Sequence, residues 1–381
     1  MKKIQLFVPV YRTDECLSEI RKCLEIGWTG MGFKTTEFEE AWKKYTGLPN
    51  AHFLNSSTIG LQLAVKIFKT KLGWLDGDEI ISTPLTFIST NHAILYENLK
   101  PIFADVDDTL CLSPESIKNK ITSKTRAVMY VGMGGNPGRL SEISRLCKQY
   151  NLVLILDAAH MSGAKYLEKH IGSEADCAIF SYHAVKNLPT ADSGMICFKD
   201  KDLDEMARKM SWLGINKDTY TRAAAGEYKW LYEVEYLGLK GHGNSIMASI
   251  ALVQLKYLDQ DNNRRRQICE RYKELLGGRM DIKFIEHLTD GISSRHLFQI
   301  RVPENLREKL LVYLNSREIY PGVHYRVNTE YKMYKYGLLT CPNAELAARE
   351  VISLPLHLQL TDEDIARVAQ SVIEFLDKNK I

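Results

Sequence analysis

The segment IFSYHAVKNLPTADSGMICF, residues 179–198, sets a lysine between two apolar runs that are typical of β-strands. Lys186 stands among small and turn-forming residues, although charged side chains usually face water. Two interpretations follow from these residues alone. Either Lys186 is a solvated loop lysine, or its amine is held ready to form a Schiff base with an aldehyde.

The composition is that of a globular protein long enough for one large domain with an appendage, or for two domains. Of its 381 residues, 45% are hydrophobic and 25% are charged, and the formal net charge is +3. The short basic clusters at 118–124 and 264–266 lack interleaved aromatics, which favours solvated surfaces over a nucleic-acid site. No apolar run reaches the roughly 18 residues of a membrane helix, and residues 1–15 do not have the pattern of a signal peptide.

The eight cysteines are scattered along the chain, without a C-x-x-C pair or the Cys/His spacing of a zinc site. Such a distribution favours free thiols in a reducing compartment. We therefore expect a cytoplasmic protein with no bound metal, and with neither nucleic acid nor membrane as a partner.

Short apolar runs alternate with helical patterns over the first 200 residues. Within 57–70, Leu61, Ala64, Val65 and Phe68 have the i, i+3, i+4, i+7 spacing of an amphipathic helix. Several of the apolar runs are rich in Ile and Val on both alternations, as strands buried on both faces are. The predicted strands are 51–55, 78–84, 100–106, 127–133, 152–159, 177–182 and 194–199. This order predicts an α/β domain with a mostly parallel, seven-stranded sheet between helices.

After about residue 200 the pattern changes to longer helices. They are predicted at 203–213, 245–258, 261–276 and 304–316, with a strand at 295–302. In the last segment, Thr361 and Asp364 predict a capped helix N-terminus. The stripe expected to be buried on that helix comprises Ile365, Val368, Ala369, Val372 and Leu376. We predict a large α/β domain over 1–244 and a small α+β domain over 245–381.

Open α/β sheets bind ligands beyond the carboxyl ends of their strands, and two of these ends carry polar groups with a possible function. Ser57 and Thr58 open a helix whose free N–H groups suit a phosphate, but serine and threonine are also good N-caps. Asp157 follows five apolar residues, and is either a functional buried carboxylate or a structural one tied to backbone N–H groups. By itself His160 is interpreted as a hydrogen-bonded histidine near the core. It belongs to a ligand site only if the other polar groups form one.

Two further strand ends complete a recognisable set. Ser181 and Lys186 flank a turn, and an amine partly withdrawn from water loses proton affinity and becomes a better nucleophile. Phe87 either packs in the core or stacks on a planar ring. Together these features match pyridoxal phosphate, which needs a lysine for its aldehyde, a carboxylate for its ring nitrogen, a phosphate cup and a stacking face.

The sequence resembles the nucleotide-sugar aminotransferases of the DegT/DnrJ type, which are fold type I pyridoxal-phosphate enzymes. The resemblance extends nearly end to end. The segments that carry it include NSSTIGLQLA (55–64), DEIISTPLTFISTNHAI (78–94), LDAAHMSGAKY (156–166), FSYHAVKNL (180–188) and GVHY (322–325). The combination of D-A-A-H, S-x-H-A-x-K-N and G-V-H-Y is far more specific than any single motif.

The resemblance implies a role for each residue around the cofactor ring. Lys186 would form the internal aldimine and later move the proton between the amino donor and the cofactor. Asp157 would pair with the pyridine nitrogen, and Phe87 would stack on the ring. His160 would lie near the ring hydroxyl.

The resemblance also implies the residues at the two ends of the site. Ser57, Thr58 and Ser181 would hold the phosphate. In a homodimer with sites at the interface, Asn244 would reach the phosphate of the neighbouring subunit. His324 and Tyr325 would lie on the substrate side.

The implied activity is the transfer of an amino group, with L-glutamate as the expected donor, to a keto-sugar linked to a nucleoside diphosphate. Pyridoxamine phosphate would be the intermediate form, and polysaccharide or other amino-sugar biosynthesis the setting. Three alternatives stay open. They are a sugar dehydratase of the same fold, whose best-known members have histidine in place of the lysine, a transaminase for a small keto acid, and a non-catalytic cofactor-binding regulator.

The chain also departs from the family pattern at three places. Ile246 stands where an arginine is usual, and Asp192-Ser193-Gly194 replaces a common E-G-G. The segment GMGGNPGRL (132–140) replaces a more usual aromatic-Gly-Gln-Pro sequence. These departures lie on the substrate side of the predicted site, so they leave the identity of the sugar open.

Overall fold

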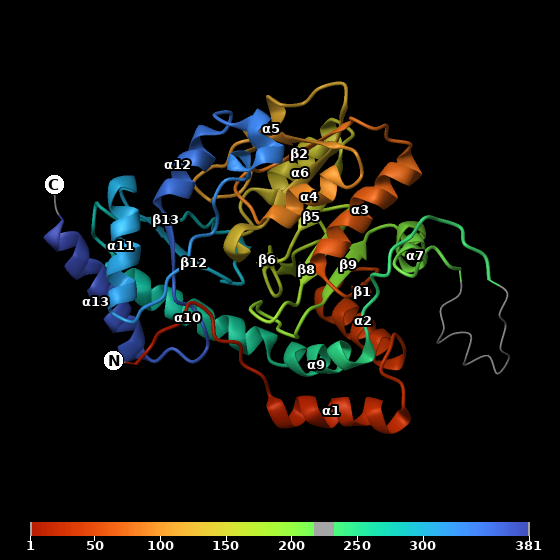
Figure 1. Cartoon of the computed structure of the whole chain (residues 1–381), viewed down its shortest axis with the longest axis horizontal. Coiled ribbons are helices and arrows are strands. Elements are labelled where there is room, and N and C mark those ends of the chain that lie inside the picture. The colour runs from red at the N-terminus through yellow and green to blue at the C-terminus, as the bar shows by residue number, and fades with distance from the viewer. Residues whose placement is uncertain (1, 217–231, 380–381) are drawn as a thin grey trace.

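The structure, a computed structural model, describes residues 2–216 and 232–379 and is built around a seven-stranded sheet (Figure 1). The strand order is β1-β9-β8-β5-β4-β2-β3. From β8 to β3 all neighbours are parallel, whereas β9 pairs antiparallel with both β8 and β1. The strands are β1 (His52–Leu54), β2 (Glu79–Ser82), β3 (Lys100–Phe103), β4 (Thr125–Val131), β5 (Val153–Asp157), β8 (Cys177–Ser181) and β9 (Gly194–Phe198). The predicted α/β fold with a mostly parallel seven-stranded sheet is confirmed.

Both faces of the sheet are apolar because helices cover each of them (Figure 1). Successive residues of a strand point to opposite faces, and on β5 Ile155 packs with α3 (Ser57–Leu72) and α7 (Lys201–Met210). Its neighbours Leu154 and Leu156 belong to the core on the opposite face. The doubly apolar alternation seen in the sequence therefore reflects burial on two sides.

The remaining helices of this part of the chain surround the sheet and its edges. They are α1 (Thr13–Ile26), α2 (Phe33–Thr46), α4 (Ile88–Leu95), α5 (Pro114–Lys118) and α6 (Leu140–Gln149). The apolar positions expected on the helix at 57–70 are all buried. A short sheet of β6 (Lys165–Tyr166), β7 (Lys169–His170) and β11 (Gly291–Ile292) was not expected, because two-residue strands leave no periodic signal.

A second core lies between the C-terminal helices and a three-stranded sheet. Its elements are α10 (Leu258–Leu276), β10 (Lys283–Phe284), β12 (Phe298–Arg301), α11 (Glu304–Ser316), α12 (Pro342–Glu350), β13 (Val351–Leu354) and α13 (Asp362–Lys378). Ile4 also packs in this core, and the first and last described residues lie on the same side of the molecule (Figure 1). By contrast α9 (Ser245–Leu255) packs on the first core through Ala248 and Ala251. The division of the chain at residue 244 stays a prediction.

Two general properties of the chain concern its cysteines and its helices. All eight cysteines are free thiols, and all are buried, which their spacing did not predict. Within the described ranges, no helix has the length and apolar character that crossing a bilayer requires.

Helix α13 begins at the capping box predicted from its sequence. The hydroxyl of Thr361 accepts a hydrogen bond from the backbone N–H of Asp364 at 3.2 Å, and the Asp364 carboxylate accepts one from the N–H of Thr361 at 3.2 Å. The stripe from Ile365 to Leu376 is buried in the second core. The cap and the stripe together orient α13 against α10 and α11.

We expect the substitution Thr361→Ala to lower the free energy of unfolding by about 1 kcal/mol, because it leaves a first-turn N–H of α13 without its acceptor. Urea unfolding followed by circular dichroism measures this loss. Thr361→Ser keeps the hydroxyl and should retain most of the stability. Equal losses in both variants would show that the hydroxyl is not what stabilises this helix start.

Candidate active site

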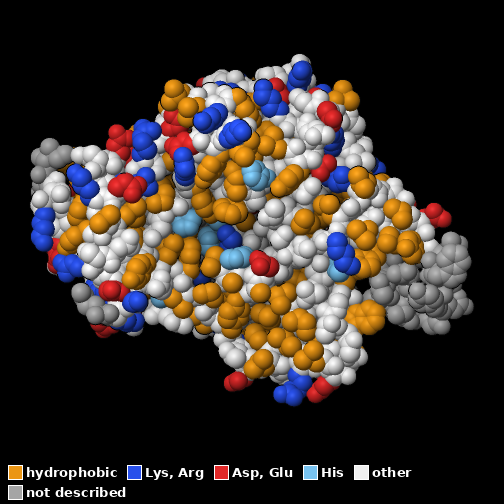
Figure 2. Space-filling model, viewed as in Figure 1, with side chains coloured by type: hydrophobic (Ala, Val, Ile, Leu, Met, Phe, Trp, Pro, Cys, Tyr) orange, Lys and Arg blue, Asp and Glu red, His pale blue; other side chains and the backbone are white. Residues whose placement is uncertain are grey.

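The predicted residues meet in one cavity of about 400 Å³ at the carboxyl ends of the parallel strands. Figure 2 shows the hollow near the middle of one face, with histidines gathered around a basic side chain. The predicted residues that line the cavity are Ser57, Thr58, Phe87, Asp157, His160, Ser181, Lys186, His324 and Tyr325. Among the predicted set, only Asn244 lies outside it.

Lys186 lies in the loop between β8 and β9. Its backbone N–H donates a hydrogen bond to the carbonyl of His183 at 2.8 Å, which helps to shape this loop. The side chain is half-buried, and its Nζ has no hydrogen-bond partner among the described residues. Burial lowers the pKa of Lys186 to about 8, although the negative charge of Asp157 acts in the opposite direction. A larger share of the amine is therefore neutral near physiological pH than in a solvated lysine.

Asp157 ends strand β5 with its carboxylate buried in the cavity wall. Its Oδ2 accepts a hydrogen bond from the Thr90 hydroxyl at 2.8 Å, and its Oδ1 accepts one from the N–H of Ala159 at 3.1 Å. Burial raises the pKa of Asp157, while these bonds and the charge of Lys186 act to lower it. Thr90 was missed from the sequence, although it lies one helical turn after Phe87 on α4.

The first turn of α3 leaves hydrogen-bond donors free at the opposite end of the cavity. Ser56 is the N-cap, and its hydroxyl accepts the N–H of Ile59 at 3.2 Å. The N–H groups of Ser57 and Thr58 have no partner among the described residues, so they remain available to an anion. The hydroxyl of Ser181 lines the same cavity from the end of β8.

Gly194 lies between β1 and β8, the strands that lead to the phosphate cup formed by Ser57, Thr58 and Ser181. It pairs with Leu54 of β1 on one side and with Ser181 of β8 on the other. A Cβ at this position would lie 2.6 Å from the backbone N of Ser57 and 2.9 Å from the carbonyl oxygen of Phe180. Close passage of β9 under the cup therefore requires glycine.

His160 has a defined tautomer. Its Nδ1 accepts a hydrogen bond from the backbone N–H of Gly134 at 3.2 Å, so a neutral ring carries its proton on Nε2. This Nε2 lies 3.3 Å from the Tyr325 hydroxyl. Burial, together with the charge of Lys186, keeps the pKa of His160 well below its usual value. His160 therefore presents a neutral N–H donor.

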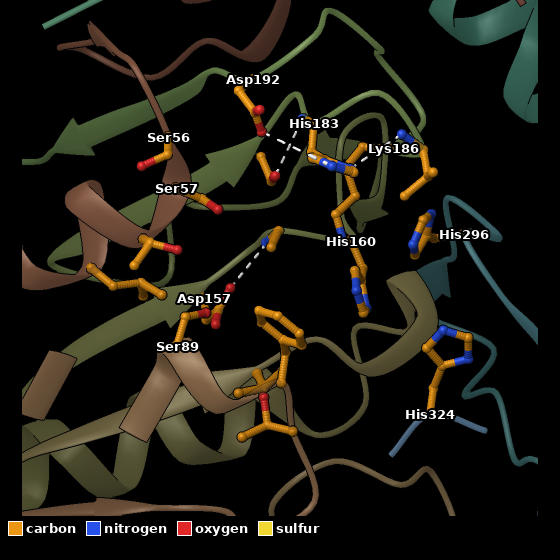
Figure 3. Close-up of a pocket in the computed structure, with 18 of the residues that line it drawn as sticks. Ser56, Ser57, Ser89, Asp157, His160, His183, Lys186, Asp192, His296 and His324 are labelled. Atoms are coloured by element: carbon orange, nitrogen blue, oxygen red, sulfur yellow. Dashed lines mark hydrogen bonds and ion pairs between the residues drawn. The ribbon is translucent and has the colours of Figure 1, made fainter. Parts of the chain in front are cut away.

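The aromatic side of the cavity is open to a ligand. Phe87 is 57% exposed, so it is not a core residue, and its ring centroid lies 6.0 Å from that of Tyr325. Nδ1 of His324 is hydrogen-bonded to the hydroxyl of Ser353 at 2.8 Å, and burial lowers the pKa of His324 to about 4. In Figure 3 His160, His296 and His324 lie together on one side, away from Ser56 and Ser57.

Asn244 has a structural role within its own chain. Its side chain accepts the N–H of Met247 at 2.9 Å and caps α9. Its expected contact with a neighbouring subunit stays a prediction.

The residues at 192–194, which depart from the family pattern, differ in their surroundings. Asp192 is exposed at the rim of the cavity, 4.0 Å from Nε2 of His183, whereas Ser193 is buried and its hydroxyl is hydrogen-bonded to that of Thr190 at 2.7 Å.

These residues fit pyridoxal phosphate on chemical grounds. One end of the cavity offers N–H and hydroxyl donors for a phosphate, and the other offers an amine with a lowered pKa for an aldehyde. The buried carboxylate of Asp157 suits a protonated ring nitrogen, because a positive partner compensates for its burial. The N–H of His160 suits a ring hydroxyl oxygen.

Comparison with known proteins agrees with this fit. The model of the DegT/DnrJ/EryC1/StrS aminotransferase family matches residues 11–373. An uncharacterized protein of Methanocaldococcus jannaschii is 33% identical over an alignment of 392 positions, which covers 98% of this chain and 99% of the relative. The aminotransferase TlmJ of Streptoalloteichus hindustanus has a similar structure, with a TM-score of 0.91, 29% identity and coverage of 99% of this chain and 100% of TlmJ.

A further similar structure is Spr1654 of Streptococcus pneumoniae, provisionally named a sugar aminotransferase. Its PMP form superposes with a TM-score of 0.88 and 28% identity over 98% of this chain and 99% of Spr1654. Its PLP form does so with a TM-score of 0.89 and 27% identity, over 99% of each chain. The cofactor suggested by the cavity is thus present in a protein of the same fold.

We expect the amine of Lys186 in the cofactor-free protein to titrate near pH 8. The rate at which a small aldehyde modifies Lys186, followed against pH by mass spectrometry, gives this midpoint. Because the charge of Asp157 acts to raise the pKa of Lys186, Asp157→Asn should move the midpoint to a lower pH. A midpoint near the ordinary value of about 10.4 would contradict the assignment of a desolvated amine.

We expect Gly194→Ala to weaken binding of pyridoxal phosphate, because the added methyl group must displace the backbone at Ser57. Overpacking of this kind costs about 1–3 kcal/mol, which corresponds to a rise of roughly 5- to 150-fold in Kd if the cost falls on the bound state. Equilibrium titration of the cofactor-free protein measures the effect. Gly30→Ala is the control, since a Cβ there meets nothing within 4 Å. Unchanged affinity in Gly194→Ala would place the phosphate elsewhere.

Proposed function

This chain belongs to the DegT/DnrJ/EryC1/StrS aminotransferase family, and we propose that it moves an amino group from L-glutamate to a keto-sugar carried on a nucleoside diphosphate. The coarser function, a pyridoxal-phosphate-dependent sugar aminotransferase, rests on the family together with structures such as Spr1654. Pyridoxal phosphate, when bound, supplies an aldehyde that carries the amino group and a ring that withdraws electrons from the neighbouring carbon.

The observation that carries the proposal is the position of Lys186 in the same cavity as Asp157 and the start of α3. With a pKa of about 8, the Nζ of Lys186 can both accept and release a proton near neutral pH. We assign to it the attachment of the cofactor and the movement of the proton in both halves of the reaction. No other lysine or arginine lines this cavity among the described residues.

The other residues would hold and orient the cofactor. Asp157, fixed by Thr90 and the N–H of Ala159, would hold the proton of the ring nitrogen. Ser57, Thr58 and Ser181 would bind the phosphate through N–H and hydroxyl groups. Phe87 and the N–H of His160 would set the plane of the ring.

The character of the cavity wall supports a sugar as the acceptor. Apart from Lys186 and the carboxylates of Asp157 and Asp192, its polar groups are hydroxyls and histidines. Burial keeps the rings of His160 and His324 neutral at physiological pH, so they add polar ring nitrogens to the cavity wall without adding charge, which suits an uncharged sugar. His324 and Tyr325 are accordingly proposed on the substrate side.

L-Glutamate brings two carboxylates, and within the described residues the cavity of one chain offers no guanidinium to bind them. We therefore propose that a second copy of the chain supplies cationic groups, in a homodimer with its sites at the interface. The eight unpaired thiols agree with a reducing, cytoplasmic location. Amino-sugar and polysaccharide biosynthesis are the proposed setting.

We expect L-glutamate to bleach the visible absorbance of the cofactor-loaded protein and to release 2-oxoglutarate, and a nucleotide-linked 3-keto or 4-keto sugar to restore the absorbance. Stopped-flow absorbance with chromatography of the products measures both halves. Lys186→Ala and Lys186→Arg should lose at least about 10²–10⁴-fold in rate, the range of general acid–base catalysis.

Lys201→Ala is the matched control, because that side chain is 79% exposed, pairs with Glu205 and does not line the cavity. Restoration of the absorbance by small keto acids alone would retain the aminotransferase and overturn the sugar acceptor. Turnover by the Lys186→Ala protein at the normal rate would overturn the assignment of the lysine.

A further inference from the structure

The residue that follows Lys186 is the centre of a buried hydrogen-bond network. Nδ2 of Asn187 donates to the carbonyl of Ser294 and to Oδ1 of Asn262, both at 2.7 Å. Asn262 in turn donates from its Nδ2 to the carbonyl of Ser162 at 2.9 Å. Backbone carbonyls only accept, so they settle which way both amides point. Oδ1 of Asn187 is therefore left as an acceptor.

His296 supplies the donor to that acceptor. Its Nδ1 lies 3.0 Å from Oδ1 of Asn187, so the ring must carry a proton on Nδ1. Burial, with the charges around it, keeps the pKa of His296 well below its usual value, and the ring is neutral. Its proton is then on Nδ1, and Nε2 has a free lone pair without a partner among the described residues.

The ring of His296 is also held from both sides. It lies against His160, with the two ring centroids 4.3 Å apart, and it stacks on Phe7 at 5.5 Å with an angle of 10° between the planes. His296 is buried and lines the cavity. Figure 3 places it beside Lys186 and His160. One ring thus contacts the neighbour of the lysine and the histidine expected at the cofactor hydroxyl.

We propose that His296 is a positioning residue for Lys186: its Nδ1–H holds Asn187, and with it the loop that presents the lysine, while its face holds the ring of His160. This inference rests on the proposed function, in which Lys186 receives the cofactor and moves the proton. Displacement of a reacting group by about 1 Å can cost on the order of 10²-fold in rate. The network joins the lysine loop to α10 and to the segment before β12, so the packing of these two elements contributes to that placement.

Two substitutions separate the bond from the bulk of the ring. His296→Phe keeps a planar ring between His160 and Phe7 but removes the donor to Asn187. His296→Asn removes the ring but can place an amide N–H close to the position of Nδ1. We expect His296→Phe to slow the uptake of pyridoxal phosphate at Lys186 by about tenfold or more. We expect His296→Asn to recover most of that loss.

Uptake is measured from the visible absorbance after the cofactor-free protein is mixed with pyridoxal phosphate, and mass spectrometry verifies the site of attachment. In turnover, His296→Phe should lower kcat with little change in KM for the sugar. His170→Phe is the matched control, because His170 is also a buried histidine packed against aromatic rings, here Trp42 and Tyr45, outside the cavity. It should take up the cofactor at the wild-type rate.

Three results would overturn the proposal: normal uptake by His296→Phe, no recovery in His296→Asn, or equal slowing by His170→Phe. The uptake measurement needs no amino donor and no sugar. If the protein transferred no amino group to any sugar, the proposed function would fail, while uptake would still decide the role of His296.

Discussion

Water solvates an ammonium group better than a cavity wall does, and this desolvation lowers the pKa of Lys186 to about 8. The arrangement of the other groups in the site depends on this desolvation of the Lys186 amine. A nearby carboxylate must be present but not in contact, because a close ion pair would hold the amine fully charged. Asp157 meets this requirement: its oxygens are engaged by Thr90 and by the N–H of Ala159, and its charge reaches Lys186 without a direct hydrogen bond.

The parallel sheet brings the groups of the site together at one edge. The carboxyl ends of β5 and β8 and the loop after β1 meet at one edge, so a carboxylate, a lysine loop and a helix start line the same cavity. Strand β9 is the exception in direction, and its first residue passes between β1 and β8. Gly194 is required there because the backbone at Ser57 leaves no room for a methyl group.

Much of the architecture was predictable from local pattern. All seven strands of the sheet were anticipated, since strands covered on two faces leave continuous apolar runs. The cap and stripe of α13 were equally readable. The short α5 and the two-residue strands β6, β7 and β11 were not predicted, because elements of this length have no measurable period.

The sequence by itself determined the chemistry: a lysine, an aspartate and a serine-threonine helix start at strand ends already indicate an aldehyde cofactor with a phosphate. Only the tertiary structure decided how those groups are held. Thr90 lies 67 positions from Asp157, and His296 lies 109 positions from Asn187. No spacing rule connects residues so far apart in the chain, because their contact depends on how the strands, α4, α10 and the segment before β12 pack together.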